Sequence, residues 1–191
     1  MFLKKWWCSL LLLPFMWYTL HQAYWALRYN IYFMVNYDFP FPVNVVYFLT
    51  RNFLLIVHEA GHTFFSIFDI RFITILGGSL FQILLPLGIL AYTWINRKKN
   101  GIQLALFLVG LSWLDVAGYA ADGGQQQLPL IGGLSSESHD WMNLLSDLGM
   151  LDRDLQVGIA FAIIGVICYL LALLVPALMR EYRQVKLDLE L

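Results

Sequence analysis

Charged residues and cysteines are scarce in this 191-residue chain. Only 13% of the residues are charged and 60% are hydrophobic, which excludes an ordinary soluble domain. The two cysteines, Cys8 and Cys168, lie far apart in apolar runs, so neither a disulfide framework nor a thiolate metal site is indicated. A net charge of −1 gives no argument for a nucleic-acid partner, and none is expected. The composition instead predicts a lipid bilayer as the surroundings.

The chain contains several long apolar stretches, and each approaches the ~20 residues that a helix needs to cross a bilayer. The first stretch follows Lys4 and Lys5 and has no cleavage site of small residues after it, so we expect a retained helix rather than a signal peptide. We predict an all-α integral membrane protein, a single domain over 1–191 with a bundle of four to five transmembrane helices. The expected helices cover about 6–27, 44–67, 79–95, 102–121 and 156–179.

The longest polar segment, 122–155, is rich in glycine and is expected to be a structured loop. Within it, a short amphipathic helix is predicted near 140–148.

Three basic clusters, at 4–5, 97–99 and 180–186, all favour the cytoplasm. Five plain crossings cannot place all three clusters there. Either the segment after the second helix is re-entrant, or the amino terminus lies outside and the chain makes five plain crossings. Residues 70–78 are β-branched, end in a glycine pair and resemble a short strand, which makes them the candidate for re-entry. Both arrangements place the carboxy terminus in the cytoplasm and 122–155 on the other side. The expected location is the bacterial cytoplasmic membrane.

The most informative motif is His58-Glu59-Ala60-Gly61-His62, inside the second apolar stretch. On a helix, residues four apart lie on one face, so both imidazoles can bind one metal ion. Glu59 is then placed as the base that takes a proton from water, which is the chemistry of zinc hydrolases. Ionisable groups at membrane depth are costly and are retained for function. Zinc is therefore the expected cofactor.

A catalytic zinc needs a third protein ligand, for which the sequence leaves several candidates. Asp115 and Asp122 share one face of the fourth predicted helix, so one could bind the metal and the other orient a histidine. His139, in the polar loop, could reach the metal as well, or the adjacent Asp140 could do so. The sequence ranks Asp115, Asp122 and His139 closely.

Residues 53–124 resemble the site-2 protease class of intramembrane zinc metalloproteases. The likeness rests on the motif at 58–62, on Gly77-Gly78-Ser79-Leu80-Phe81-Gln82 followed by Pro86, and on Asp115 or Asp122-Gly123-Gly124. In that class the two histidines bind zinc, the glutamate is the catalytic base, an aspartate of a later Asp-Gly motif is the third ligand, and a re-entrant strand follows the zinc helix. The segment 125–141 departs from the class, and no inserted domain of the PDZ kind is present.

The sequence thus predicts a membrane-embedded zinc-dependent hydrolase, in the first place a metalloprotease that cleaves peptide bonds of a membrane or membrane-proximal substrate. Three alternatives stay open. The chain could hydrolyse a lipid or small molecule, it could be a non-catalytic metal-binding subunit, or it could be a di-iron oxidase with Glu59 and His62 as ligands. The expected partners are the bilayer and a peptide or membrane-protein substrate.

Overall fold

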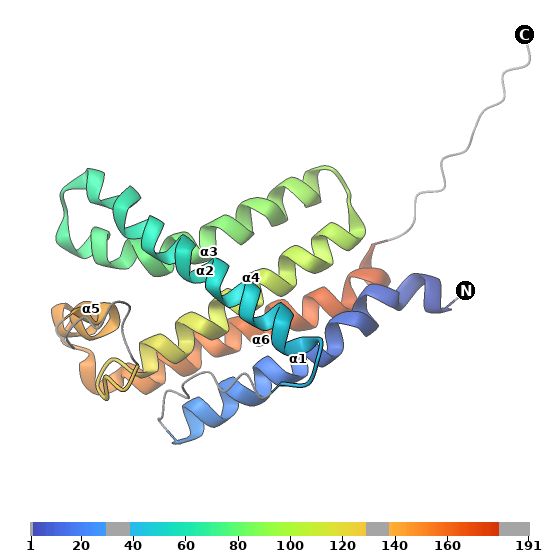
Figure 1. The fold of residues 1–191 in the computed structure, drawn as a ribbon. Helices are drawn as coiled ribbons and strands as arrows, with labels where there is room; N and C mark the ends of the chain where they lie inside the picture. The colour runs from blue at the N-terminus through green and yellow to red at the C-terminus, as the bar shows by residue number, and fades with distance from the viewer. Residues whose placement is uncertain (1, 30–38, 129–137, 180–191) are drawn as a thin grey trace, which may run out of the picture.

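The computed structural model describes residues 2–29, 39–128 and 138–179, and this part of the chain folds into helices and turns without a strand (Figure 1). The predicted all-α class is confirmed for these residues. The elements are α1 (Phe2–Tyr29), α2 (Val43–Phe65), the 3₁₀ turn η1 (Ser66–Phe68), α3 (Arg71–Ile95), α4 (Lys99–Ala121), α5 (Asp140–Asp147), the 3₁₀ turn η4 (Leu151–Arg153) and α6 (Asp154–Leu178).

Helix α4 is the centre of the bundle and packs on α1, α3 and α6. Its contact with α6 is close because glycines face the partner helix: a Cβ on Gly110 would come within 2.5 Å of the Tyr169 ring, and one on Gly158 within 2.7 Å of the Ala117 carbonyl oxygen. In the most apolar 18-residue stretch of α4, 67% of the residues are buried, against 22% in the corresponding stretch of Leu151–Leu178, which contains α6. Helix α4 is therefore enclosed by its neighbours, whereas α6 leaves most of its apolar surface on the outside of the bundle.

Three described helices are long and apolar enough to cross a membrane: α3, α4 and the stretch Leu151–Leu178 that contains α6. The first and second predicted stretches do form helices α1 and α2, but α2 carries Arg51, Glu59 and two histidines, which lower its hydropathy. Membrane association follows from the three spans. The predicted total of four to five crossings stays a prediction.

The strand expected at 70–78 is wrong, because α3 begins at Arg71 and runs as one helix through Gly77 and Gly78. The chain turns from α2 into α3 over η1 and Asp69, whose φ of 52° is left-handed. The glycine pair serves helix packing rather than a turn: a Cβ on Gly61 of α2 would lie 2.3 Å from the Gly77 carbonyl oxygen. The re-entrant segment is not confirmed, and the chain forms a helical hairpin there.

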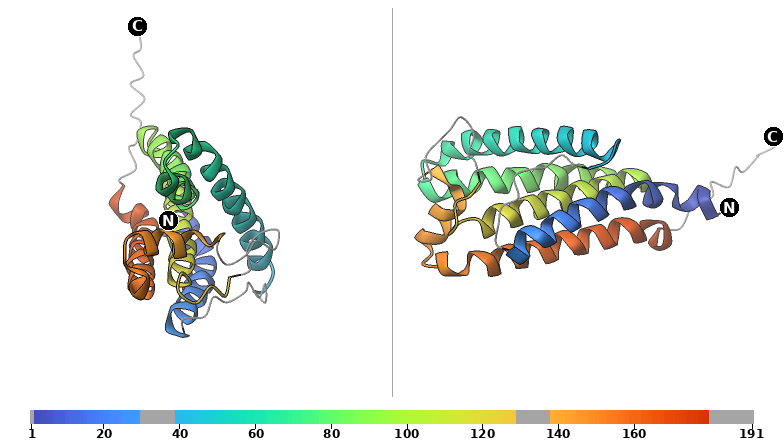
Figure 2. Two further views of the ribbon diagram at one scale, coloured as in Figure 1. Left: turned by 90° about the vertical axis from the view of Figure 1, so that its left-hand side faces the viewer. Right: turned by 60° about the horizontal axis from the view of Figure 1, so that its bottom comes forward.

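The two ends of the bundle differ in character. The start of α1, the turn between α3 and α4 and the end of α6 lie at one end, whereas α5 covers the other end, where α2 turns into α3 (Figure 1 and Figure 2). The first of these ends carries basic residues of the 97–99 turn. The predicted short helix near 140–148 is confirmed as α5. Which end faces the cytoplasm stays a prediction.

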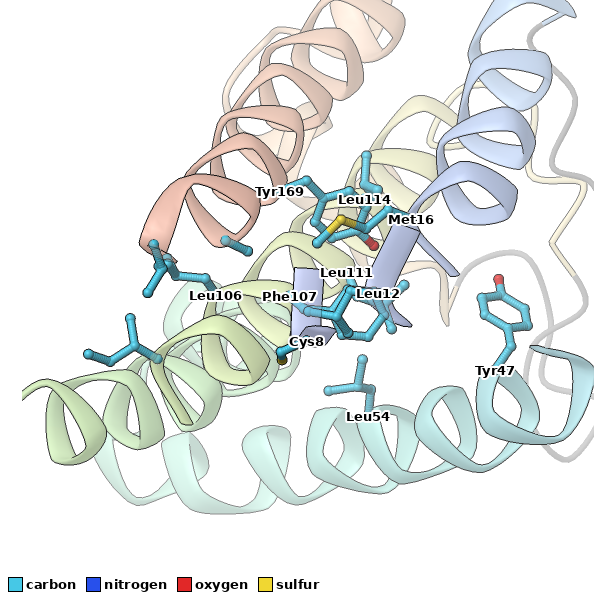
Figure 3. Close-up of a cluster of buried hydrophobic side chains, with 13 residues drawn as sticks. Cys8, Leu12, Met16, Tyr47, Leu54, Leu106, Phe107, Leu111, Leu114 and Tyr169 are labelled. Atoms are coloured by element: carbon cyan, nitrogen blue, oxygen red, sulfur yellow. The ribbon is translucent and has the colours of Figure 1, made fainter. Parts of the chain in front are cut away.

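Two groups of buried side chains hold the bundle together. The larger group joins α1, α4 and α6 around Leu12, Leu111 and Tyr169, with Leu54 of α2 at its edge (Figure 3). The smaller group joins α3 and α4 to α5 through Trp141, whose indole nitrogen donates to the Ser79 hydroxyl at 3.0 Å. The second group matters most for the site, because it fixes α5 against the helical hairpin.

Candidate metal centre

His58 and His62 lie on the face of α2 that is turned toward α3 and α5. They are one helical turn apart, their ring centroids are separated by 4.8 Å, and His58 is buried. Gly78 of α3 makes room for both rings: a Cβ there would come within 2.6 Å of the His58 Nε2 atom and 2.5 Å of the His62 Nε2 atom. The sequence therefore keeps a side chain out of the space that the two nitrogens share.

Asp140, the first residue of α5, faces the same space from the other side. Its Oδ2 atom lies 2.9 Å from His58 Nε2 and 3.1 Å from His62 Nε2. One ligand atom from each of the three residues lies within 4.8 Å of the other two, and among the described residues these three form the His/Cys/Asp/Glu group compact enough to bind one metal ion. The third candidate ligand thus comes from the loop and not from the fourth helix.

Each histidine has a hydrogen-bond acceptor at Nδ1, which places the ring proton on Nδ1 rather than on Nε2. The Nδ1 atom of His62 lies 2.9 Å from the Thr74 carbonyl oxygen, which can only accept. The Nδ1 atom of His58 lies 3.1 Å from Gln82 Oε1, and the Gln82 amide is oriented because its Nε2 donates to Asp115 at 2.7 Å. We infer that both Nδ1 atoms carry a proton, so both Nε2 lone pairs point at Asp140.

This arrangement fits a metal ion. Two Nε2 lone pairs and a carboxylate oxygen converge, and without a cation the imidazoles can bond to Asp140 only by carrying a second proton. Burial raises the pKa of the Asp140 carboxyl, but the hydrogen bonds from His58 and His62 outweigh burial and hold that pKa below its ordinary value. Asp140 is thus kept as an anion. Two imidazoles and one carboxylate are a donor set of catalytic zinc sites.

Glu59 lies beside this donor set and is exposed, in contrast to buried His58. Glu59 precedes His62 by three residues on α2, so the two side chains leave neighbouring positions on the helix surface. An exposed carboxylate next to the metal position can exchange protons with water, which a general base requires.

The other sequence candidates lie outside the three-residue cluster. Asp115 forms an ion pair with Arg51 (Nε to Oδ1, 3.5 Å) and accepts a hydrogen bond from Gln82. It therefore contacts His58 only indirectly and orients it through Gln82. Asp122 and His139 form a pair of their own (3.1 Å) in which both side chains are buried.

The His139–Asp122 pair nevertheless helps to position Asp140. The Nδ1 atom of His139 accepts the Met142 backbone N–H at 3.2 Å, which makes His139 the N-cap of α5. This bond assigns the proton to Nε2, which donates to Asp122. Asp122 also accepts the backbone N–H groups of Gln127 and Leu128 and so fastens the loop. His139 therefore places the next residue, Asp140, over the histidines.

Sequence reasoning missed two residues of this site, Gln82 and Tyr119. The Tyr119 hydroxyl accepts the Asp140 backbone N–H at 3.1 Å, and its ring lies 5.8 Å from that of His58. A signal was available for Tyr119, since it is four residues after Asp115 on the polar face of the helix. Gln82 ends the stretch from Gly77 that contributes to the resemblance, but nothing local assigns it a role at the site.

Comparison of this chain with protein-family models, with curated proteins and with solved structures found no match.

Proposed function

We propose that this protein is a membrane-embedded zinc-dependent hydrolase, and specifically a metalloprotease acting on a membrane or membrane-proximal substrate. The observation that carries the proposal is the convergence of His58, His62 and Asp140 on a space that Gly78 keeps open, with Glu59 beside it. Three protein ligands leave a fourth position for water and substrate, as catalytic zinc requires. A structural zinc site uses four protein ligands instead.

Each residue then has a defined task. His58, His62 and Asp140 would hold the ion, and zinc, when bound, polarises a carbonyl oxygen and lowers the pKa of water toward ~7. Glu59 takes the proton from the attacking water and passes it to the leaving amine. Gln82 and Thr74 keep the imidazoles in the tautomer that binds metal. Peptide hydrolysis is the reaction that this set of groups supports best.

The site lies at the α5 end of the bundle, opposite the end with the basic 97–99 turn. Basic residues favour the cytoplasm, so we place the carboxy-terminal end of α6 there and the zinc site near the opposite face of the membrane. On this proposal the membrane is the bacterial cytoplasmic membrane. A site at that depth suits a substrate whose cleaved bond lies near the membrane surface.

The deciding experiment compares wild type with Glu59→Gln after purification in detergent. Zinc content is measured by elemental analysis, and hydrolysis is followed by mass spectrometry on a mixture of membrane-protein fragments. We expect about one zinc per chain in both proteins and loss of turnover by ~10²-fold or more in the variant, because general-base catalysis contributes ~10²–10⁴-fold.

The control for metal dependence is 1,10-phenanthroline against its non-chelating 1,7 isomer. Only the chelator should abolish hydrolysis. Undiminished turnover in Glu59→Gln would remove Glu59 as the base, and iron in place of zinc, or no metal at all, would overturn the proposed function.

A further inference from the structure

A cavity with a volume of about 50 Å³, open on one side, lies between α1, α2 and α4. It forms because α1 packs mainly on α4 and α6 rather than on α2, which leaves a space beside Leu54. The cavity is separate from the space between the two histidines and Asp140.

The cavity has walls of two kinds. Ala23 and Ala26 of α1, together with Leu54 and Leu114, provide apolar surface. The polar wall is the Arg51–Asp115 pair, which is only partly exposed: the side-chain fractions are 18% and 28%. A charged pair inside a membrane bundle is costly and marks a functional position. The pair offers N–H donors and carboxylate acceptors within one wall.

The polar wall is connected to the metal centre by one side chain. Asp115 accepts from Gln82 Nε2 at 2.7 Å, and Gln82 Oε1 lies 3.1 Å from His58 Nδ1. Leu54 precedes His58 by one turn of α2 and lines the cavity. The cavity wall is therefore linked to His58 through Gln82, on the side of the ring that carries Nδ1.

We propose that this cavity is the specificity pocket of the enzyme: it takes an apolar side chain of a peptide substrate, while Arg51 and Asp115 bind the peptide group beside it. A peptide group carries one C=O acceptor and one N–H donor, which match the two charges of the wall. A phospholipid matches less well, because its phosphate offers only acceptors, which suit Arg51 but not Asp115, and an acyl chain has nothing to pair with either charge. This inference rests on the proposed function.

The test fills the cavity and leaves the metal ligands intact. Ala23→Leu with Ala26→Leu adds bulk from α1, and the milder Ala26→Val serves if the double variant is unstable. Gly88→Leu on α3 is the matched control, because a Cβ at Gly88 meets no atom within 4 Å. All variants are made both in the active protein and in a Glu59→Gln background, which preserves bound substrate. Zinc content equal to that of the parent protein shows that each variant has folded.

The probe is a transmembrane peptide of leucine and alanine that carries photoreactive leucine, added to the Glu59→Gln protein in phosphatidylcholine vesicles. We expect cross-links to α1, α2 and α4 around the cavity. Labelling should fall at least fivefold in the filled variants and stay unchanged in Gly88→Leu. In the active background, the filled variants should lose hydrolysis of peptides with large apolar side chains and retain hydrolysis of those with alanine.

Two outcomes would overturn the pocket. One is labelling of the same residues by a photoreactive phosphatidylcholine but not by the peptide, and the other is wild-type hydrolysis of all peptides by the filled variants. Failure of the proposed function is recognised separately: wild type would then hydrolyse no peptide, whereas cavity-dependent peptide labelling would still establish the binding site.

Discussion

Two histidines bind a metal only when the nitrogen that faces it carries no proton, and a different acceptor enforces this at each of His58 and His62. A backbone carbonyl does so for His62. For His58 the acceptor is an amide, which could in principle present either end. Asp115 removes that ambiguity by accepting from the Gln82 nitrogen. A residue that the sequence offered as a zinc ligand thus acts one step away from the metal position.

Replacing Gln82 tests this role. Gln82→Leu removes the acceptor at His58 Nδ1 without touching a ligand, and we expect zinc affinity to fall 10–100-fold, the usual effect of losing such a supporting hydrogen bond. Affinity is measured by competition with a zinc-binding dye. Gln103→Leu is the matched control, because Gln103 is also a buried glutamine, bonded instead to Ser9 and the Ala172 carbonyl. Unchanged affinity in Gln82→Leu would show that the Nδ1 acceptor does not matter.

Helix α5 is short, yet it carries Asp140, the third proposed ligand, so its placement matters more than its length. It is held by the His139 cap, by Trp141 on Ser79 and by Arg71, which pairs with Asp147 and donates to Asn143. The first two contacts are buried and the last is exposed. Exposed ion pairs contribute ~0–1 kcal/mol, so the buried contacts determine where Asp140 lies.

His139→Ala is therefore expected to weaken zinc binding, although His139 lies outside the cluster of proposed ligands. The variant loses an N-cap, which costs about 1 kcal/mol, and leaves Asp122 buried without its imidazole partner. We expect at least a fivefold rise in the zinc dissociation constant, measured by dye competition, and faster proteolysis of the loop that α5 terminates. His21→Ala, at an exposed histidine of α1, should match wild type. A variant with normal zinc affinity would contradict the positioning role.

The sequence allowed prediction only of those site residues that are brought together by local spacing along one helix. His58, Glu59 and His62 were predicted together because one turn of helix brings them together whatever the rest of the chain does. Asp140 lies 82 residues from His58 in sequence, and only the docking of α5 brings the two together. The helix itself was predictable from its amphipathic pattern. Its exact contact with α2 was not, because buried partners such as Ser79 and Trp141 decide it.

The wrong strand at 70–78 has a similar cause. β-branched residues next to two glycines favour extended structure locally. Here they face a second helix that also carries a glycine, and close backbone packing of Gly61 on Gly77 favours the helical hairpin instead. Local propensity is a weak guide where tertiary packing is this tight.

At the scale of the whole molecule, the proposed metal centre joins two parts of the fold that are far apart in the sequence. His58 and His62 belong to the α2–α3 hairpin, whereas Asp140 belongs to the segment between α4 and α6. Zinc bound to all three would hold the hairpin against that segment. Since a ligand that binds only the folded state stabilises it, zinc should raise the melting temperature of the protein.

We expect the melting temperature in detergent at pH 7.5 to rise by several degrees with zinc at 100 times its dissociation constant, equivalent to ~2.7 kcal/mol. The rise should be absent in His58→Ala/His62→Ala and should shrink at pH 5.5. Protons compete with zinc for the imidazole nitrogens as the pH falls, because an imidazole binds metal only in its neutral form. Asp140 is not the cause, because its lowered pKa keeps it ionised there, and its contribution to stability is lost only below ~3.9, the unfolded value. An equal rise in the double variant would place the zinc elsewhere.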